Sequence, residues 1–378
     1  PLLAVVLGLL DTANALKSFA NPIIFLFFGG FALATALHIQ GIDRFIANRM
    51  IGFAKGKLWL AVIMLFVATA LLSMWISNTA TAAIMLPLGL GILSNLDTKR
   101  DRNTFVFVLL GIAYSSNIGG FGTIVGSPPN AIAAAELDLD FFSWIKLGVP
   151  FMIVMLPSCI FLMYLVLKPK LNATLDIKKE NIVWGFHSIS AIIIFVITAI
   201  AWIFSTKISA YFGGIKDIDS IIAIAAVIAI GFTKTASWEQ IQKNTEWGVL
   251  MLFGGGLALS AILKDSGASE VMANGMVALF GENSWIVIII AVATFIIFLT
   301  EFTSNTASAA LLVPIFGSVG DAVGMPPALL VLIIGFGASC AFMLPVATPP
   351  NAIIFGTGRI RQIEMIKVGI FLNILSIV

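Results

Sequence analysis

The sequence predicts an all-α polytopic membrane protein with an inverted-topology repeat, two re-entrant helical hairpins and broken transmembrane helices. Composition, internal similarity and charge placement each support this fold class. Of the 378 residues, 60% are hydrophobic and 11% are charged, and the mean hydropathy is +1.07. A soluble domain cannot hide that much apolar surface, and many uncharged runs reach the ~20 residues needed to cross a bilayer. The formal net charge of +2 gives no indication of a nucleic-acid partner.

The apolar segments, taken in order, define the expected domains. Repeat 1 is expected over 1–168 and repeat 2 over 227–378, joined by a cytoplasmic linker and extra helix region over 169–226. In repeat 1 we expect scaffold helices over 1–57, an inner hairpin over 58–94, a broken helix over 104–135 and a helix over 141–167. In repeat 2 we expect a scaffold helix over 247–263, an outer hairpin over 284–320, a broken helix over 322–357 and a helix over 363–378.

Internal similarity indicates that the two halves are copies of one another. GGFALATALHIQG (29–41) matches GGLALSAILKDSG (255–267) at an offset of 226 residues. SNTATAA (77–83) matches SNTASAA (304–310) at an offset of 227. GSPPNAI (126–132) matches ATPPNAI (347–353) at an offset of 221. Separate blocks that agree in order and spacing are the signature of a duplicated unit.

Charge placement gives the two copies opposite orientations. Cytoplasmic loops carry an excess of Lys and Arg, and such residues flank the run 58–94 on both sides: Arg44, Arg49, Lys55, Lys57, Lys99, Arg100 and Arg102. The corresponding run 284–320 is flanked mainly by acidic residues and by one basic residue, Lys264. Both ends of the first run are therefore expected inside, and both ends of the second outside, as in many secondary transporters.

The length of each Ser-Asn-Thr run predicts a hairpin rather than one crossing. The 37 residues of 58–94 would measure about 55 Å as a straight helix, whereas the hydrocarbon core is about 30 Å thick. We therefore expect Ser-Asn-Thr at the tip of a re-entrant hairpin, near mid-membrane. A tip exposes the last carbonyls of one helix and the first amides of the next. It can therefore hold a cation and a carboxylate side by side.

Further polar positions recur in both copies. Ser73 and Thr300 each precede the serine of a tip by four residues, on the same helical face. The proline pairs at 128–129 and 349–350 end a helix and leave carbonyls unpaired. A lone Ser or Thr in a membrane helix usually bonds to its own turn, but duplication favours a binding role.

These residues resemble the divalent anion:sodium symporter (DASS) family, the INDY-type bacterial sodium/dicarboxylate transporters, which carry paired Ser-Asn-Thr motifs at oppositely oriented hairpin tips. The resemblance implies sodium-driven import of C4-dicarboxylates (succinate, malate or fumarate) by an elevator-type alternating-access mechanism. It also implies a homodimer in the lipid bilayer of the bacterial inner (plasma) membrane. Sodium ions would be co-transported, and no organic cofactor is expected.

The resemblance also implies site residues at the matching positions. Those expected to meet the substrate carboxylates are Asn78, Thr79, Ser127, Asn305, Thr306, Thr348 and Pro349. Those expected to bind the first sodium ion are Ser73, Ser77, Asn78 and Gly126. Those expected to bind the second sodium ion are Thr300, Thr303, Asn305 and Ala347.

Other functions remain open at this stage. A sodium/proton antiporter needs a titrating carboxylate in the site, and Glu301 is the one acid well inside an apolar run. Its counterpart in repeat 1 is Met74, so a structural pairing and a place in an aqueous cavity are both open. An anion channel or sensor on the same scaffold is a further alternative, although no signalling domain is visible. No catalytic constellation is visible, so an enzyme is not expected. Repeat 1 begins at Pro1, so we expect one or two N-terminal helices to be missing.

Overall fold

The helices of both repeats are defined by a computed structural model of the chain. It describes residues 2–8, 11–94, 96–98, 100–174, 184–268, 271, 275, 285–322 and 325–378, without the side chains of 264, 265, 321 and 322. Within these ranges the secondary structure is helical, apart from one isolated bridge between Lys57 and Thr174. The predicted all-α fold class is confirmed.

The helices of the first half precede residue 168. In chain order they are α1 (Leu2–Val6), α2 (Thr12–Lys17), η1 (Ser18–Ala20), α3 (Pro22–Ile39), α4 (Ile42–Gly52), α5 (Leu58–Ser73), α6 (Asn78–Leu93), α7 (Arg102–Gly119), η2 (Gly120–Gly122), η3 (Ile124–Gly126), α8 (Pro128–Glu136) and α9 (Phe141–Leu167).

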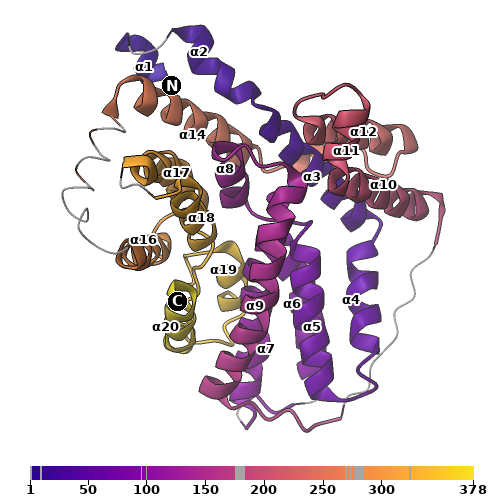
Figure 1. Ribbon diagram of the computed structural model, residues 1–378. Coiled ribbons are helices and arrows are strands. Elements are labelled where there is room, and N and C mark those ends of the chain that lie inside the picture. The colour runs from indigo at the N-terminus through magenta and orange to yellow at the C-terminus, as the bar shows by residue number, and fades with distance from the viewer. Residues whose placement is uncertain are drawn as a thin grey trace.

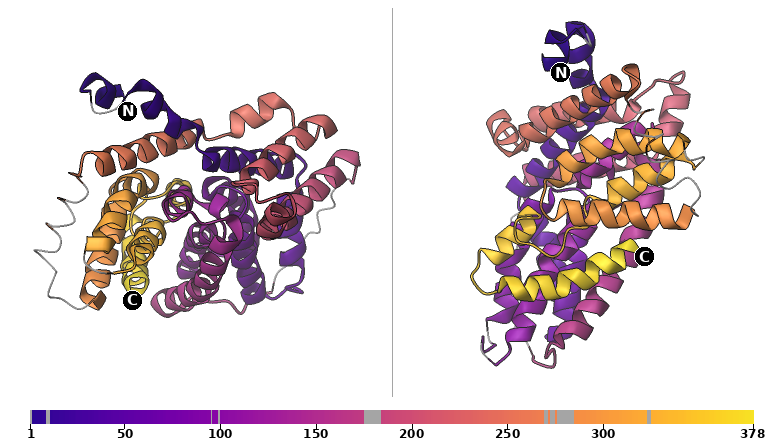
Figure 2. Two further views of the ribbon diagram at one scale, coloured as in Figure 1. Left: turned by 45° about the horizontal axis from the view of Figure 1, so that its top comes forward. Right: turned by 90° about the vertical axis from the view of Figure 1, so that its left-hand side faces the viewer.

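The helices of the second half follow residue 185 and pack beside the first half (Figures 1 and 2). In chain order they are α10 (Phe186–Ile203), α11 (Ser205–Tyr211), α12 (Ile218–Thr233), α13 (Trp238–Asn244), α14 (Trp247–Asp265), α16 (Trp285–Thr300), α17 (Asn305–Ala322), α18 (Pro327–Gly337), α19 (Pro349–Phe355) and α20 (Gln362–Ile377).

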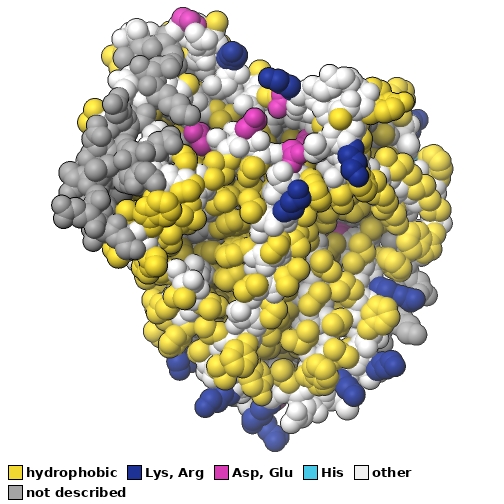
Figure 3. Space-filling model, in the orientation of Figure 1, with side chains coloured by type: hydrophobic (Ala, Val, Ile, Leu, Met, Phe, Trp, Pro, Cys, Tyr) yellow, Lys and Arg dark blue, Asp and Glu magenta, His cyan; other side chains and the backbone are white. Residues whose placement is uncertain are grey.

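Helix length and composition fit a multi-pass membrane protein. Among the described residues, four spans are long and apolar enough to cross a bilayer, and a fifth results if the bent pair α13–α14 counts as one. The four are Thr12–Ile39, Arg102–Gly122, Phe141–Leu167 and Phe186–Ile203. Figure 3 shows a broad apolar surface with basic side chains gathered at its lower end, whereas acidic and basic side chains mix at the upper end. This separation matches the charge rule for a membrane protein.

The two Ser-Asn-Thr runs form the predicted hairpins. Helices α5 and α6 have 16 residues each and pack against one another. Each is about 24 Å long, which is short of the ~30 Å hydrocarbon core. Helices α16 and α17 form the equivalent pair in the second half. Residue 284, where the outer hairpin was expected to begin, lies outside the described residues, as do Lys178 and Lys179 of the expected linker.

The two broken helices share one internal bracing pattern. Helices α7 and α8 are separated by the Gly-rich stretch before Pro128, and α18 and α19 by the stretch before Pro349. Asn130 Nδ2 donates to the carbonyls of Gly120 at 2.7 Å and Thr123 at 2.8 Å. Asn351 Nδ2 donates to the two carbonyls that lie 221 residues further on, at 3.1 and 3.0 Å. The duplication is therefore visible in hydrogen bonds as well as in sequence.

Helix α7 forms the centre of the fold. It is buried from Thr104 to Gly119 and packs against α5, α6, α9 and α19. A Cβ atom on Gly119 would lie 2.3 Å from the carbonyl oxygen of Ala70 on α5, so this close approach requires glycine. The broken helix is thereby held tightly against the inner hairpin.

Before α3, the described residues form the short helices α1, α2 and η1. Gly8 has a φ of 71°, a left-handed conformation that ends a helix. Asp11 then caps α2 by accepting the Asn14 amide at 2.7 Å.

Candidate functional site

The two hairpin tips and the two Pro-Pro breaks meet around one cavity of about 370 Å³. All seven residues expected to contact the substrate line it: Asn78, Thr79, Ser127, Asn305, Thr306, Thr348 and Pro349. They come from four separate elements, α6, α8, α17 and α19, or from the residues just before them. The fold therefore brings together positions that are up to 271 residues apart in the chain.

All four of these helices begin at the cavity, but α8 and α19 begin with proline pairs, which carry no N–H group. In α6 and α17 the first amides lack partners within the helix and carry the positive end of the helix dipole. Ser77 Oγ accepts the Ala80 amide at 3.4 Å, and Ser304 Oγ accepts the Ala307 amide at the same distance. These long caps leave the other first-turn amides available. The cavity is consequently suited to an anion without any charged side chain to hold it.

Behind each tip, a hydroxyl group faces the tip asparagine. Ser73 Oγ donates to Asn78 Oδ1 at 2.6 Å, and Thr300 Oγ1 donates to Asn305 Oδ1 at 2.5 Å. Both hydroxyl residues are fully buried and do not line the cavity. A Cβ atom on Gly120 would lie 2.7 Å from Asn78 Oδ1, so that oxygen packs directly on the backbone of the broken helix. Such clusters of neutral oxygens are typical of sodium sites in transporters.

The remaining expected sodium ligands divide into two groups. Ser77, Gly126 and Ala347 line the cavity. Thr303 does not, because its hydroxyl donates to the Leu299 carbonyl at 2.9 Å, one helical turn back. Threonine often forms this local bond in a helix. Seven of the eight expected sodium residues thus line the cavity or hydrogen-bond to a tip asparagine that does, and Thr303 does neither.

Two polar residues at the cavity were not expected from the sequence. Asn117 on α7 is buried and lies with its Nδ2 3.2 Å from Thr348 Oγ1. It ends the triplet Ser115-Ser116-Asn117, and this polar triplet in an apolar helix was a usable signal. Glu246 lies between α13 and α14, where the chain bends by 60°. In the sequence it looks like an ordinary residue before an apolar segment.

Glu301 lies away from the cavity and is 1% exposed. Its Oε1 accepts the amides of Phe342 at 2.8 Å and Met343 at 2.9 Å, and also Asn373 Nδ2 at 2.8 Å. Its Oε2 accepts the Leu344 amide at 3.0 Å. The carboxyl group therefore satisfies the backbone of the break before α19. Of the two roles left open by the sequence, the geometry favours structural pairing.

A profile of the citrate transporter family (CitMHS) matches residues 1–325 and 220–378. The chain belongs to this family. An uncharacterized transporter of Haemophilus influenzae is 59% identical over 385 residues, covering 100% of this chain and 84% of the relative. A sodium-dependent dicarboxylate transporter, SdcS, of Staphylococcus saprophyticus is 34% identical over 414 residues, covering 100% of this chain and 79% of the relative. The resemblance to sodium/dicarboxylate transporters is confirmed, and the protein is a multi-pass membrane transporter rather than an enzyme.

The fold of this transporter also has a solved counterpart. The crystal structure of the Alcanivorax borkumensis YdaH transporter, described as having an unusual topology, matches with a TM-score of 0.60. The two chains are 13% identical, and the match covers 100% of this chain and 86% of the other. This similarity confirms the fold alone.

Hydrogen bonds across the repeats join the two halves of the transporter's site. Ser127 Oγ lies 3.1 Å from Ser339 Oγ, and the Tyr114 hydroxyl donates to the Phe342 carbonyl at 2.7 Å. Each bond links the broken helix of one repeat to that of the other. The two Pro-Pro breaks are consequently fixed relative to one another.

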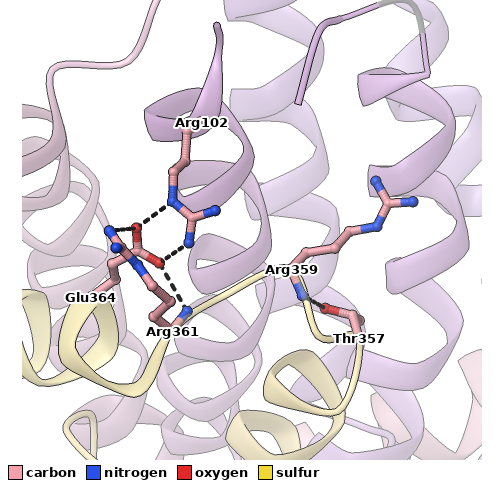
Figure 4. Close-up of polar contacts among 5 residues, drawn as sticks. All are labelled: Arg102, Thr357, Arg359, Arg361 and Glu364. Atoms are coloured by element: carbon pink, nitrogen blue, oxygen red, sulfur yellow. Dashed lines mark hydrogen bonds and ion pairs between the residues drawn. The ribbon is translucent and has the colours of Figure 1, made fainter. Parts of the chain in front are cut away.

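A second link between the repeats lies at the basic end of the transporter (Figure 4). Arg102, at the start of α7, donates through Nε and Nη2 to the two carboxylate oxygens of Glu364 on α20, each at 2.7 Å. Arg361 adds its amide at 2.8 Å and its Nη2 at 3.0 Å. A two-point pair of this kind fixes geometry as well as adding attraction.

Next to the inner tip, the transporter carries a stack of aromatic rings. Trp75 lies parallel to Trp202 of α10, with an interplanar angle of 3° and 6.5 Å between ring centroids. Phe141 of α9 stacks on both, at 6.0 Å from Trp75 and 4.6 Å from Trp202. The stack connects the inner hairpin to α10.

Proposed function

We propose that this transporter is a sodium-coupled secondary-active symporter that imports C4-dicarboxylates such as succinate, malate or fumarate. The observation that carries the proposal is the pairing of two uncharged tips in one cavity. Each tip offers helix-start amides for a carboxylate and hydroxyl and amide oxygens for a cation. A ligand with a carboxylate at each end fits two such tips. The volume of about 370 Å³ is in the range of small-molecule sites.

The expected residues would have distinct roles in this scheme. Asn78, Thr79 and Ser127 would bind one substrate carboxylate, while Asn305, Thr306, Thr348 and Pro349 would bind the other. Ser73, Ser77, Asn78 and Gly126 would hold the first sodium ion, and Thr300, Thr303, Asn305 and Ala347 the second. The residues that line the cavity include no Arg or Lys, so bound sodium would offset the dianion's charge. Sodium binding would therefore precede or accompany substrate binding.

The links between the repeats support an elevator-type movement. Because hydrogen bonds join the two Pro-Pro breaks, the two halves of the site would move together as one rigid unit. Repeat 1 (1–168) and repeat 2 (227–378) would each supply one hairpin and one broken helix to that body. We place the symporter as a homodimer in a bacterial inner membrane, with the basic end in the cytoplasm.

The geometry of Glu301 argues against sodium/proton antiport. A carboxylate that accepts four hydrogen bonds and does not line the cavity is poorly placed to exchange protons during transport. The symport proposal does not require it to titrate.

Uptake by proteoliposomes tests the proposal. Labelled succinate should accumulate when an inward sodium gradient is imposed, and should not when choline replaces sodium at equal ionic strength. Unlabelled malate and fumarate should compete, whereas acetate should compete poorly because it can engage one tip only. Accumulation driven by a proton gradient in the absence of sodium would overturn the proposal.

A further inference from the structure

Glu246 is the one carboxyl group among the residues that line the cavity. The other polar side chains there are amides and hydroxyls. The bend between α13 and α14 places Glu246 in the lining of the cavity, together with Ser77 of the inner tip. A cavity suited to an anion thus contains an acidic group. A negative charge there weakens anion binding, so we expect this group to have a specific role.

The position of Glu246 breaks the symmetry of the cavity. The other polar positions come largely in matched pairs, such as Asn78 with Asn305 and Thr79 with Thr306. The residue 226 positions before Glu246 is Ala20, which carries no polar side chain and does not line the cavity. A ligand with two identical ends would be served by the matched pairs alone. The extra group is useful to a ligand whose two ends differ.

The chemistry of the carboxyl group defines that difference. Its two oxygens can accept up to about four hydrogen bonds, and at least one oxygen accepts in either protonation state. Glu246 is half-buried, and a bound ligand would shield it further from water. A shielded acceptor left without a donor is costly, so a ligand that brings a donor is favoured over an isostere that lacks it.

We propose that Glu246 selects, among C4-dicarboxylates, those that carry a hydroxyl group at C2, such as malate, over the unsubstituted succinate. Two carboxylates bound at the tips place the C2 substituent between the tips, in the cavity that Glu246 also lines. The hydroxyl donates its hydrogen to the Glu246 carboxyl group. This inference rests on the proposed dicarboxylate function.

Equilibrium binding to the purified transporter in sodium tests the inference, with malate and succinate as probes. The parent protein should bind malate about tenfold or more tighter than succinate, the usual effect of one hydrogen bond to a charged group. Glu246→Gln keeps an acceptor oxygen without the charge and should retain part of this preference. Glu246→Leu has no acceptor, and its affinity ratio should fall to about one.

Glu239→Leu is the matched control. Glu239 is exposed on α13, away from the cavity, so its loss removes a similar charge and should leave the affinity ratio unchanged. Equal affinities in the parent protein, or a preference that persists in Glu246→Leu, would overturn the inference while leaving the dicarboxylate function intact. Failure of both ligands to bind in sodium would overturn the proposed function itself.

Discussion

Replacing Glu301 by Gln removes a buried charge while keeping the shape of the side chain. The carboxyl group accepts four hydrogen bonds, three at Oε1 and one at Oε2. In the orientation that loses fewer hydrogen bonds, the Gln oxygen takes the place of Oε1 and still accepts three of them. Its NH₂ group then faces the Leu344 amide, and two donors meet where a donor and an acceptor met before.

The expected loss of stability follows from these contacts. One hydrogen bond to a charged group is lost, worth about 1.5–3 kcal/mol, and three others weaken by about 1 kcal/mol each as the charge disappears. Relief from burying a carboxylate offsets part of this sum. We expect a net loss of about 2–3 kcal/mol for Glu301→Gln, because the offset is itself a few kcal/mol. Glu301→Met, which installs the residue of repeat 1, leaves all four donors unpaired and should cost more than about 4 kcal/mol.

Two measurements separate this structural role from a role in transport. Melting of the purified protein in detergent should shift down by several degrees in Glu301→Gln and further in Glu301→Met. Sodium-dependent succinate uptake, normalised to folded protein, should survive in Glu301→Gln with an unchanged apparent KM. An unchanged melting temperature combined with lost uptake would refute the structural reading and favour proton exchange at Glu301.

Three further predictions concern the site, the topology and the link between the repeats. Asn78→Ala and Asn305→Ala each remove a proposed sodium ligand and a proposed substrate donor, so each should weaken sodium-dependent succinate binding about a hundredfold or more; near-parental binding by both variants would contradict the proposed site. Cysteine at Thr98 should react with impermeant thiol reagents only from the cytoplasmic side, and cysteine at Ser266, an exposed residue just after the scaffold helix of repeat 2, only from outside. The native cysteines are buried, which keeps their background low; reaction of both from one side would exclude the inverted repeat. Glu364→Gln should lower the melting temperature by a few degrees while sparing substrate affinity, because it breaks a link distant from the cavity; a change in affinity without one in melting would contradict this.

Duplication made much of the site predictable from the sequence. The tips and the Pro-Pro breaks stand out because both repeats carry the same uncommon sequence motifs, SNT and PPN, at nearly constant spacing. The pairing of Ser73 with Asn78 and of Thr300 with Asn305 likewise follows from a four- to five-residue separation around a helix end. Recognising the tips and the Pro-Pro breaks was therefore enough to predict most of the polar residues that line the cavity.

Residues that occur in only one copy could not be found in this way. Glu246 corresponds to Ala20, and its position at the cavity depends on the direction of the bend between α13 and α14, which the sequence does not define. Asn117 reaches Thr348 only through packing between the repeats. The role of Glu301 depended on four donors from residues 41–72 positions away. Tertiary geometry decides each of these cases.

The parallel stack of Trp75 on Trp202 gives the transporter an internal optical reporter. Two indole rings with 6.5 Å between centroids and 3° between planes hold each other in a fixed environment, to which tryptophan absorption and emission are sensitive. Trp75 lies two residues before Ser77 of the inner tip, whereas Trp202 belongs to α10. A change in the distance between the inner hairpin and α10 would therefore alter the tryptophan signal. If the hairpin moves as proposed, ion and substrate binding could be followed on the unlabelled protein, without attaching a dye near the site.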